Sequence, residues 1–328
     1  MRKGAMRVFW MLGATLAATF SQAATITVTK PTDGEYLGRS NNVQINITGS
    51  NREATVVVTA TNVANPANRV SVERKFTPEP GGDATGTIPL NFGETSPQGA
   101  YNIQVVATEP GNTYNTVAPI PVIVDIRNPK IVDFDPISNS FVDGTVNIRA
   151  TLDEPNIKEW RVRVNNSDIP NNSGNTEEIN VVWDASSILT DGTQNIEFRV
   201  EDLAGNVTNR NVSVTLDRRA PVISILAPAN GTTLFPRSSL AVVLNVQDQF
   251  ANAIDRTGVD VTLVSMDNRF LARVSRRSIR TDGNRIVWTG RVQSKFRLPG
   301  QFKLVVTAVD KAGNAAARQE VVLRVQGQ

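Results

Sequence analysis

The sequence predicts an all-β protein, with three tandem β-sandwiches behind an N-terminal signal peptide. Three observations lead to this prediction. Short runs in which polar and apolar residues alternate, such as residues 211–216, are typical of half-buried strands. The turn sequence Asp-Leu-Ala-Gly-Asn at residues 202–206 recurs as Asp-Lys-Ala-Gly-Asn at residues 310–314, and such a recurrence indicates repeated domains. Residues 1–23 have the composition of an export signal.

The signal-like segment has a basic start, an apolar centre and a small-residue end. Three basic residues precede an apolar run over residues 8–20, and Ser21 and Ala23 occupy the −3 and −1 positions of a cleavage site before Ala24. The apolar run is too short to span a membrane. The chain has no cysteine, so lipid anchoring through cysteine and disulfide bonds are excluded. We therefore expect an exported protein, either periplasmic or secreted, with no membrane span.

The domain starts repeat in the same way as the turns. Each begins with proline, has Gly or Asn three residues later and an aliphatic residue six residues later: Pro31, Gly34, Leu37; Pro136, Asn139, Val142; Pro228, Gly231, Leu234. Asn is the commonest substitute for Gly where φ is positive, so we expect Asn139 in the left-handed region. These repeats place the domains at residues 24–126, 127–219 and 220–328.

Within the domains, the strand pattern fits a two-sheet sandwich. The first domain has seven short strand-like runs, at residues 25–29, 43–48, 55–60, 70–76, 85–90, 101–108 and 117–126. About seven strands in about 100 residues are typical of such a sandwich. In the second domain, alternation places Trp160 and Trp183 on inward faces, and we expect both indoles in the core. Residues 165–175 read as a polar loop.

The second and third domains resemble bacterial immunoglobulin-like repeats. The resemblance rests on Val181-Val182-Trp183-Asp184, on Asp191-Gly192-Thr193 and on the turn at residues 202–206; the joint at residues 217–221 is similar to the usual junction between such repeats. The first domain is less similar, because its turn lacks the Asp and the Ala. The resemblance implies a sandwich fold and a secreted setting. Such repeats serve as stalks, adhesin modules and appendages of surface enzymes, so no single activity follows.

Charge is distributed unevenly along the chain. Residues 24–126 carry 6 basic and 9 acidic side chains, residues 127–219 carry 10 and 15, and residues 220–328 carry 15 and 7. The first two domains are therefore acidic and the third is basic, an asymmetry that suggests a charged partner.

The basic residues of the third domain are concentrated in one segment. Nine of the 15 lie between residues 269 and 297: Arg269, Arg273, Arg276, Arg277, Arg280, Arg285, Arg291, Lys295 and Arg297. Asp282-Gly283 reads as the two-residue loop of a hairpin, which would place Arg280 opposite Arg285, a repulsive pair unless an anion lies between them. The inward residues would be Ile279, Ile286, Trp288 and Val292. Arg277 falls in the same inward phase, so either the strand is bulged or the register differs.

We predict that the binding residues are five arginines of this segment: Arg273, Arg276, Arg280, Arg285 and Arg291. Three interpretations of the basic face remain open. It is a solvated surface balanced by the acidic domains, or it contacts the acidic face of a neighbouring domain or of a second copy, or it binds an anionic envelope glycan. Nucleic acid is not expected, because aromatic residues for base stacking do not alternate with these arginines.

The sequence offers little for catalysis. The absence of His and Cys removes Ser-His-Asp, Cys-His and most zinc chemistry. Two adjacent carboxylate pairs remain, Asp153 with Glu154 and Glu177 with Glu178, but neighbouring residues on a strand point to opposite faces. We therefore predict no enzyme, no catalytic residue and no resident cofactor. A polysaccharide-active enzyme is an alternative that would need two carboxyl groups converging in a cleft.

Calcium at the domain joints is left open, although no metal site is predicted. Asp125, Asp133 and Asp135 lie near the first joint, and Asp202 and Asp217 lie near the second. Carboxylates suit Ca²⁺, but these spacings do not match an EF-hand loop. The leading hypothesis is an interaction, adhesion or scaffolding module at the cell envelope that uses the basic face. The second hypothesis is a passive stalk or spacer.

Overall fold

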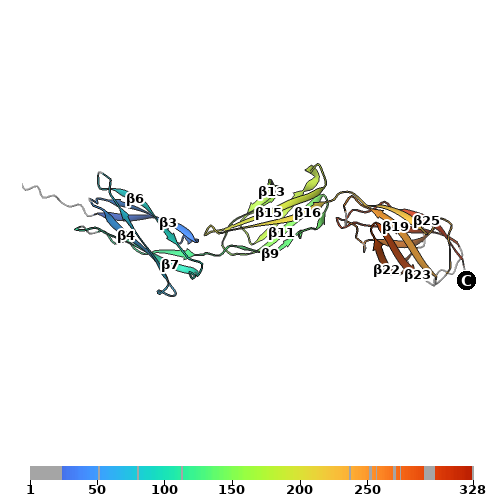
Figure 1. Ribbon diagram of the computed structural model, residues 1–328, viewed down its shortest axis with the longest axis horizontal. Helices are drawn as coiled ribbons and strands as arrows, with labels where there is room; N and C mark the ends of the chain where they lie inside the picture. Colours follow the sequence, from blue (N-terminus) through green and yellow to red (C-terminus); the bar gives the residue numbers. More distant parts are fainter. Residues whose placement is uncertain are drawn as a thin grey trace, which may run out of the picture. The chain divides into compact units, whose positions relative to one another are not determined.

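The protein is all-β, as predicted. The structure, a computed structural model, describes residues 24–326 apart from residues 51, 80, 112–113, 236–237, 251–252, 256, 269–270, 274 and 292–299. Its elements are strands and a single turn of 3-10 helix within this described part (Figure 1). The predicted signal peptide, residues 1–23, lies outside the described residues.

The chain divides into two compact units. The first contains the chain up to Arg127 together with Leu203–Asn206, and the second contains Asn128–Asp202 and Val207–Gln328. One hydrophobic core belongs to the first unit and two belong to the second, in the part of the chain that the structure describes. Each core lies between two sheets, which we call the first, second and third sandwich. The predicted boundaries after residues 126 and 219 stay predictions.

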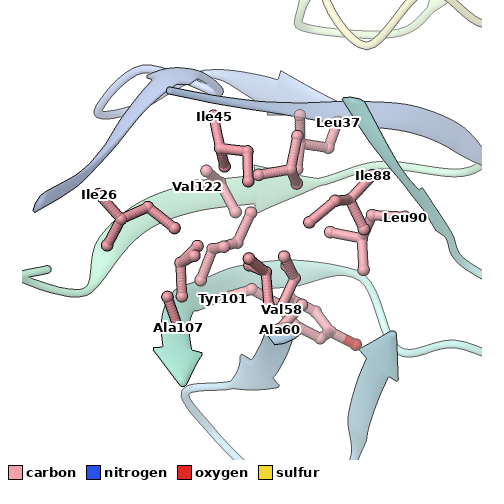
Figure 2. Close-up of a cluster of buried hydrophobic side chains, with 14 of the residues drawn as sticks. Ile26, Leu37, Ile45, Val58, Ala60, Ile88, Leu90, Tyr101, Ala107 and Val122 are labelled. Carbon is pink, nitrogen blue, oxygen red and sulfur yellow. The ribbon is translucent and has the colours of Figure 1, made fainter. Parts of the chain in front are cut away.

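The first sandwich pairs a three-stranded sheet with a five-stranded one. In the order of their pairing, the strands are β1 (Thr25–Lys30), β3 (Ser40–Thr48) and β6 (Ala84–Asn91) in one sheet, and β2 (Tyr36–Leu37), β8 (Ile120–Val124), β7 (Gly99–Thr108), β4 (Ala54–Asn62) and β5 (Arg69–Phe76) in the other. All seven predicted strands are present, and β2 is additional. Figure 2 shows Ile45 and Ile88 from one sheet and Val58 and Val122 from the other in the space between them.

The second sandwich repeats this arrangement. Its strands are β9 (Lys130–Asp135), β11 (Thr145–Asp153) and β14 (Glu178–Asp184) in one sheet, and β10 (Phe141–Val142), β16 (Val207–Leu216), β15 (Gly192–Asp202), β12 (Ile157–Val164) and β13 (Ser167–Gly174) in the other, with the 3-10 turn η1 (Ala185–Ser187) after β14. Trp160 and Trp183 are 6% and 3% exposed, so their predicted place in the core is confirmed.

The predicted polar loop at residues 165–175 is wrong, because most of it forms β13. Asn165 and Asn166 both have positive φ, 50° and 62°, which is the backbone of a type I′ hairpin turn. The turn reverses the chain so that β13 pairs with β12. Residues 167–174 have no alternation of apolar residues, because β13 is an outer strand that contributes little to the core.

The third sandwich has one strand more in its first sheet. Its strands are β17 (Val222–Ala227), β19 (Ser239–Gln247), β23 (Arg285–Arg291) and β22 (Ser275–Asp282) in one sheet, and β18 (Thr233–Leu234), β25 (Gln319–Val325), β24 (Gly300–Thr307), β20 (Asp260–Ser265) and β21 (Leu271–Arg273) in the other. Trp288 on β23 is the largest fully buried side chain of its core.

The strand order is that of an immunoglobulin-type sandwich, in which strands A, B and E form one sheet and strands C, F and G the other. In the first sandwich β1, β3 and β6 take the places of A, B and E, and β4, β7 and β8 take those of C, F and G. The hydroxyl of Tyr101, near the start of β7, donates to the carbonyl of Pro97 at 2.8 Å. This contact is the tyrosine corner of such folds.

The predicted domain starts have one common geometry. Gly34, Asn139 and Gly231 have φ of 74°, 66° and 83°, so the left-handed Asn139 is confirmed. Their N–H groups donate to carbonyl groups of β8, β16 and β25 at 2.9, 2.7 and 2.7 Å. The prolines before them, Pro31, Pro136 and Pro228, each follow a cis peptide bond.

Two outer strands contain proline. β6 is one of the two outer strands of its sheet and includes Pro89, and β13 is one of the two outer strands of its sheet and includes Pro170. Proline lacks the N–H that a sheet ladder needs, so outer strands are where it is tolerated.

Candidate functional site

The predicted basic residues are distributed over both sheets of the third sandwich. Arg276 and Arg280 lie on β22, and Arg285 and Arg291 lie on the adjacent β23, so these four belong to one hairpin. Arg273 is on β21, in the opposite sheet. Among the other predicted members of the segment, Arg269, Lys295 and Arg297 lie outside the described residues. The structure therefore assembles part of the predicted site on the hairpin β22–β23.

The predicted register of the hairpin is wrong by two residues, because the loop lies one residue later than predicted. Asp282 pairs with Arg285, and Arg280 pairs with Val287, not with Arg285. The loop is Gly283-Asn284, because Gly283 has a φ of 53° and a type II′ turn takes Gly at its first central position. An opposite-charge pair therefore replaces the predicted repulsive one, and the register gives no reason for an anion between two arginines.

The core face of the hairpin is largely as predicted. Ile286 and Trp288 are buried, and Ile279, opposite Trp288, packs against the same core. Val292 lies outside the described residues. The register shifts between Arg276 and Ser278, so the strand is bulged. Sequence alternation placed Arg277 on the inward face, which called for either a bulge in the strand or a different register. The structure has both.

Arg280 and Arg285 project from the outer face of the hairpin and are exposed. Neither forms an ion pair with another residue in the described part of the chain. Their guanidinium groups are therefore available to an anionic partner.

The turn of the hairpin borders a hollow of about 730 Å³ at one end of the third sandwich. Its lining includes Ile286 from the hairpin, Phe250 and Ile254 from the loop after β19, and the charged side chains of Asp255 and Lys311. The hydroxyl and the N–H of Thr257 donate to Asp255 at 2.8 Å and hold the pKa of that carboxyl below its usual value.

Three acids gather beside this hollow, at the joint between the second and third sandwiches. Asp217 follows β16, Asp248 follows β19, and Asp310 begins the turn after β24. One carboxylate oxygen of each lies within 4.8 Å of the others. Asp217 is 0% exposed and Asp310 is 3% exposed. We call these three residues the joint acids.

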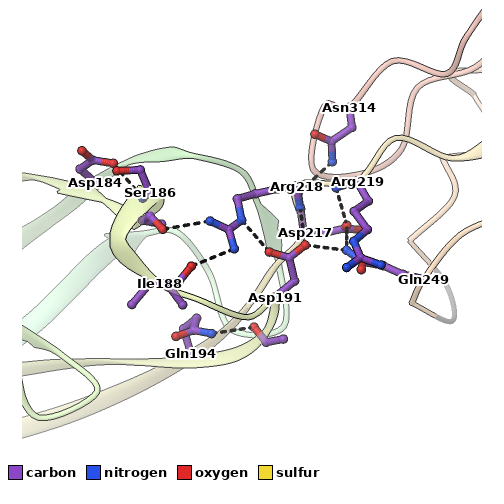
Figure 3. Close-up of polar contacts among 12 residues, drawn as sticks. Asp184, Ser186, Ile188, Asp191, Gln194, Asp217, Arg218, Arg219, Gln249 and Asn314 are labelled. Atoms are coloured by element: carbon purple, nitrogen blue, oxygen red, sulfur yellow. Dashed lines mark hydrogen bonds and ion pairs between the residues drawn. The ribbon is translucent and has the colours of Figure 1, made fainter.

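Hydrogen bonds fix the joint acids in place. The amide group of Asn314 donates to the main-chain carbonyl of Asp217 and to the carboxylate of Asp310, both at 2.8 Å. The side-chain amide of Gln249 donates to the carboxylate of Asp217 (Figure 3). The joint is therefore built from β16 on one side and from two loops of the third sandwich on the other.

A second network surrounds Asp191, just before β15. The guanidinium of Arg218 donates to its carboxylate at 2.6 Å and to the carbonyl of Ile188 at 2.9 Å, and Gln249 donates to the same carboxylate at 2.9 Å (Figure 3). Burial alone would raise the pKa of Asp191, but the hydrogen bonds from Gln249 and Arg218 hold it below its usual value. Gln249 joins the two networks.

The aspartates considered for calcium come from different strands and from the residues that follow them. Asp133 and Asp135 are exposed on β9, Asp125 follows β8, and Asp202 ends β15. Only Asp217 among them is a joint acid.

Sequence reasoning missed the other two joint acids. Asp310 could have been singled out from the sequence, because it starts the repeated turn, whereas nothing in the sequence distinguishes Asp248.

The adjacent carboxylate pairs show no arrangement for acid and base catalysis. Asp153 is exposed and Glu154 is buried, so the two side chains do not share a face. Glu177 and Glu178 are both exposed at the start of β14, and Glu178 accepts a hydrogen bond from Thr151 at 3.2 Å.

Among the residues that the structure describes, no helix has the length and apolar character that crossing a membrane requires. No family model and no curated protein matches the chain.

Solved structures with tandem domains do match. The chain is similar to fibronectin(III)-like modules of Clostridium thermocellum CbhA, with 15% identity, covering 61% of this chain and 94% of that one at a TM-score of 0.41. It is also similar to a three-Ig segment of titin in an E-to-A mutated variant (12% identity, 94% and 99% covered, TM-score 0.36). A tetra-tandem repeat from the extending region of a large adhesion protein also matches (16% identity, 93% and 74% covered, TM-score 0.27).

The chain has an immunoglobulin-like tandem fold. The strand order of its sandwiches establishes this, so the resemblance seen in the sequence is confirmed at the level of the fold.

Proposed function

We propose that the protein is an exported, non-catalytic interaction module of the cell envelope, which binds an anionic partner through the hairpin β22–β23. The observation that carries the proposal is the exposure of Arg280 and Arg285 without an ion-pair partner in the described chain. Residues 220–328 have 15 basic and 7 acidic side chains, so the field around the hairpin attracts anions.

Two kinds of partner suit this surface. One is an acidic glycan of the cell envelope, and the other is a protein surface such as the acidic second sandwich of another copy. Both would bind through charge, so both interactions should weaken with salt.

The test is binding of the chain without residues 1–23 to an immobilised acidic polysaccharide, together with its self-association, at about 0.01 M and about 1 M salt, where the Debye length falls from about 30 Å to about 3 Å. Arg280→Glu and Arg285→Glu should each weaken binding by about threefold to tenfold at low salt. Arg69→Glu is the matched control, because Arg69 is exposed on β5 of the first sandwich and the charge change is equal.

The comparison has clear opposing results. Weaker binding to the polysaccharide in the hairpin variants, but not in the control, supports a glycan partner. Weaker self-association in the hairpin variants, but not in the control, supports a protein partner. If the wild-type chain shows neither retention nor self-association at low salt, the proposal is wrong.

A spacer is the second candidate, and the joint between the second and third sandwiches favours it. Arg218, Asp191 and Gln249 are linked across this joint by hydrogen bonds of 2.6 and 2.9 Å. A spacer needs such fixed joints.

Trypsin should therefore cut slowly after Arg219 in the wild type and faster in Gln249→Ala. Gln301→Ala is the control, because Gln301 is exposed on β24, and this variant should be cut as slowly as the wild type. Rapid cutting of the wild type at this bond would contradict the spacer function.

A further inference from the structure

The joint acids have the spacing of ligands around one cation. One carboxylate oxygen from each of Asp217, Asp248 and Asp310 lies within 4.8 Å of the other two. Ca²⁺ binds oxygen at 2.3–2.6 Å, so two oxygens on opposite sides of the same ion are about 5 Å apart at most. The three carboxylates can therefore contact one calcium ion with little rearrangement.

An unsatisfied oxygen is a separate indication of a ligand. Asp217 is fully buried, and its Oδ2 atom has no hydrogen-bond partner, while Oδ1 accepts from the N–H of Arg219 and from Gln249. Asp248 has the same division, since Oδ1 accepts from the N–H of Phe250 at 3.1 Å and Oδ2 is buried without a partner. A buried carboxylate oxygen without a partner is costly. Asp217 and Asp248 are thus each held by one oxygen and have the other oxygen left for a ligand, whereas both carboxylate oxygens of Asp310 accept hydrogen bonds from Asn314.

The cluster also lacks a positive charge. In the described part of the chain, no lysine or arginine forms an ion pair with any joint acid. The ammonium group of Lys311, the residue after Asp310, lies 5.7 Å from the centre of the Phe141 ring instead. The three carboxylates are neighbours, since one oxygen of each lies within 4.8 Å of the others. A divalent cation would neutralise most of this charge.

From these observations we propose that the joint between the second and third sandwiches binds a calcium ion between Asp217, Asp248 and Asp310. Hard carboxylate oxygens suit calcium, whereas zinc prefers the histidine and cysteine that this chain lacks. Asp217 ends the second sandwich, and the other two acids belong to loops of the third, so the ion fixes the joint. The site is independent of the hairpin arginines, so the failure of either proposal leaves the other intact.

Calcium binding to the chain without residues 1–23, after treatment with a chelator, is the first test. Titration calorimetry should detect binding in the range of about 10⁻⁵ to 10⁻³ M. Asp217→Asn and Asp248→Asn should each lose one equivalent of bound calcium, or bind it at least about tenfold more weakly. Asp267→Asn should bind like the wild type, because Asp267 is an exposed acid in the turn after β20.

Thermal unfolding separates lost binding from a damaged fold. In chelator at neutral pH, Asp248→Asn should melt at a higher temperature than the wild type, because the substitution removes repulsion among the joint acids. In calcium, the wild type and Asp267→Asn should gain stability and Asp248→Asn should not.

Three results would overturn the proposal. They are no calcium binding by the wild type up to about 10 mM, equal calcium equivalents in the wild type and both joint variants, and an equal gain in melting temperature from magnesium and from calcium at the same concentration.

Discussion

The guanidinium of Arg218 closes the end of the β15–β16 ladder by donating to the carboxylate of Asp191 at 2.6 Å. Gly192 and Leu216 are the last pair of this ladder, so the ion pair connects the residues just beyond it on each strand. The Asp191 side chain is 10% exposed and the Arg218 side chain is 28% exposed. The pair is thus shielded from water, and removing one member leaves a poorly solvated charge.

Arg218→Ala should destabilise the second sandwich by about 2–4 kcal/mol, because Asp191 and the carbonyl of Ile188 both lose a donor. Urea unfolding followed by tryptophan fluorescence measures this loss. Arg163→Ala is the control: its ion pair with Asp168 is largely exposed, so we expect less than about 1 kcal/mol. Equal effects in the two variants would show that burial of the Arg218 pair adds nothing.

Acid should remove the contribution of Asp191. Its pKa is lowered in the folded state, so the stabilisation is present above the unfolded value, near 3.8, and is lost as the pH falls through the lower folded value. The difference in unfolding free energy between the wild type and Asp191→Asn should therefore be constant near neutral pH and shrink below about pH 4. A difference that grows on acidification would contradict this assignment.

Asp248 should show the opposite sign when calcium is absent. Its pKa is raised in the folded state, so the ionised group destabilises the fold, and protonation relieves the penalty. In chelator, Asp248→Asn should be more stable than the wild type at neutral pH. This advantage should disappear as the pH falls through the raised pKa towards the unfolded value of 3.8. An advantage independent of pH would mean that charge is not its cause.

Gly174 lies beneath the ring of Trp160, its partner across the β12–β13 pair. A Cβ atom at this position would lie 2.5 Å from Cζ2 of the indole. Gly174→Ala should therefore displace the ring and destabilise the sandwich by about 1–3 kcal/mol, with a change in near-ultraviolet circular dichroism. Ser173→Ala, at an exposed neighbour on β13, should stay within about 0.5 kcal/mol of the wild type. An unchanged indole signal in Gly174→Ala would refute the close contact.

Asn139 provides a test of the repeated domain start. Asn139 has a φ of 66°. Asn139→Ala should destabilise the second sandwich by about 1 kcal/mol, because alanine has no polar group that can form a local hydrogen bond and offset the strain of the left-handed region. Asn139→Gly should be close to neutral, since Gly34 and Gly231 occupy the same place. Denaturant midpoints of the two variants give the comparison, and the reverse order of stability would be inconsistent with a left-handed Asn139.

The sequence was sufficient for the parts of the fold that depend on periodicity. Alternation places Trp160 and Trp183 in the core, and both are buried. The residues of β13 do not alternate, since an outer strand can form through its ladder and the turn at Asn165 and Asn166 alone. The hairpin register was ambiguous because Asp282-Gly283 and Gly283-Asn284 are both good turn pairs. Ile279 faces an inward residue in both registers, Ile286 in the predicted one and Trp288 in the structure, so the core pattern could not distinguish them.

The candidate sites depended even more on tertiary structure. The exposed arginines of the hairpin could be predicted from composition, because a run of charges must lie largely in solvent. The joint acids could not, since Asp217, Asp248 and Asp310 are far apart in the sequence and an isolated Asp has an ordinary role in any turn. Only the packing of three loops against the joint brings them within 4.8 Å.

The prolines of β6 and β13 have a consequence for molecules crowded together. Pro89 and Pro170 lie on outer strands, where a passing polypeptide would otherwise dock and extend the sheet towards a fibril. Each proline interrupts the row of N–H groups that such growth requires. These two edges are therefore poor templates for the addition of a strand from another molecule, and fibril growth through them is disfavoured.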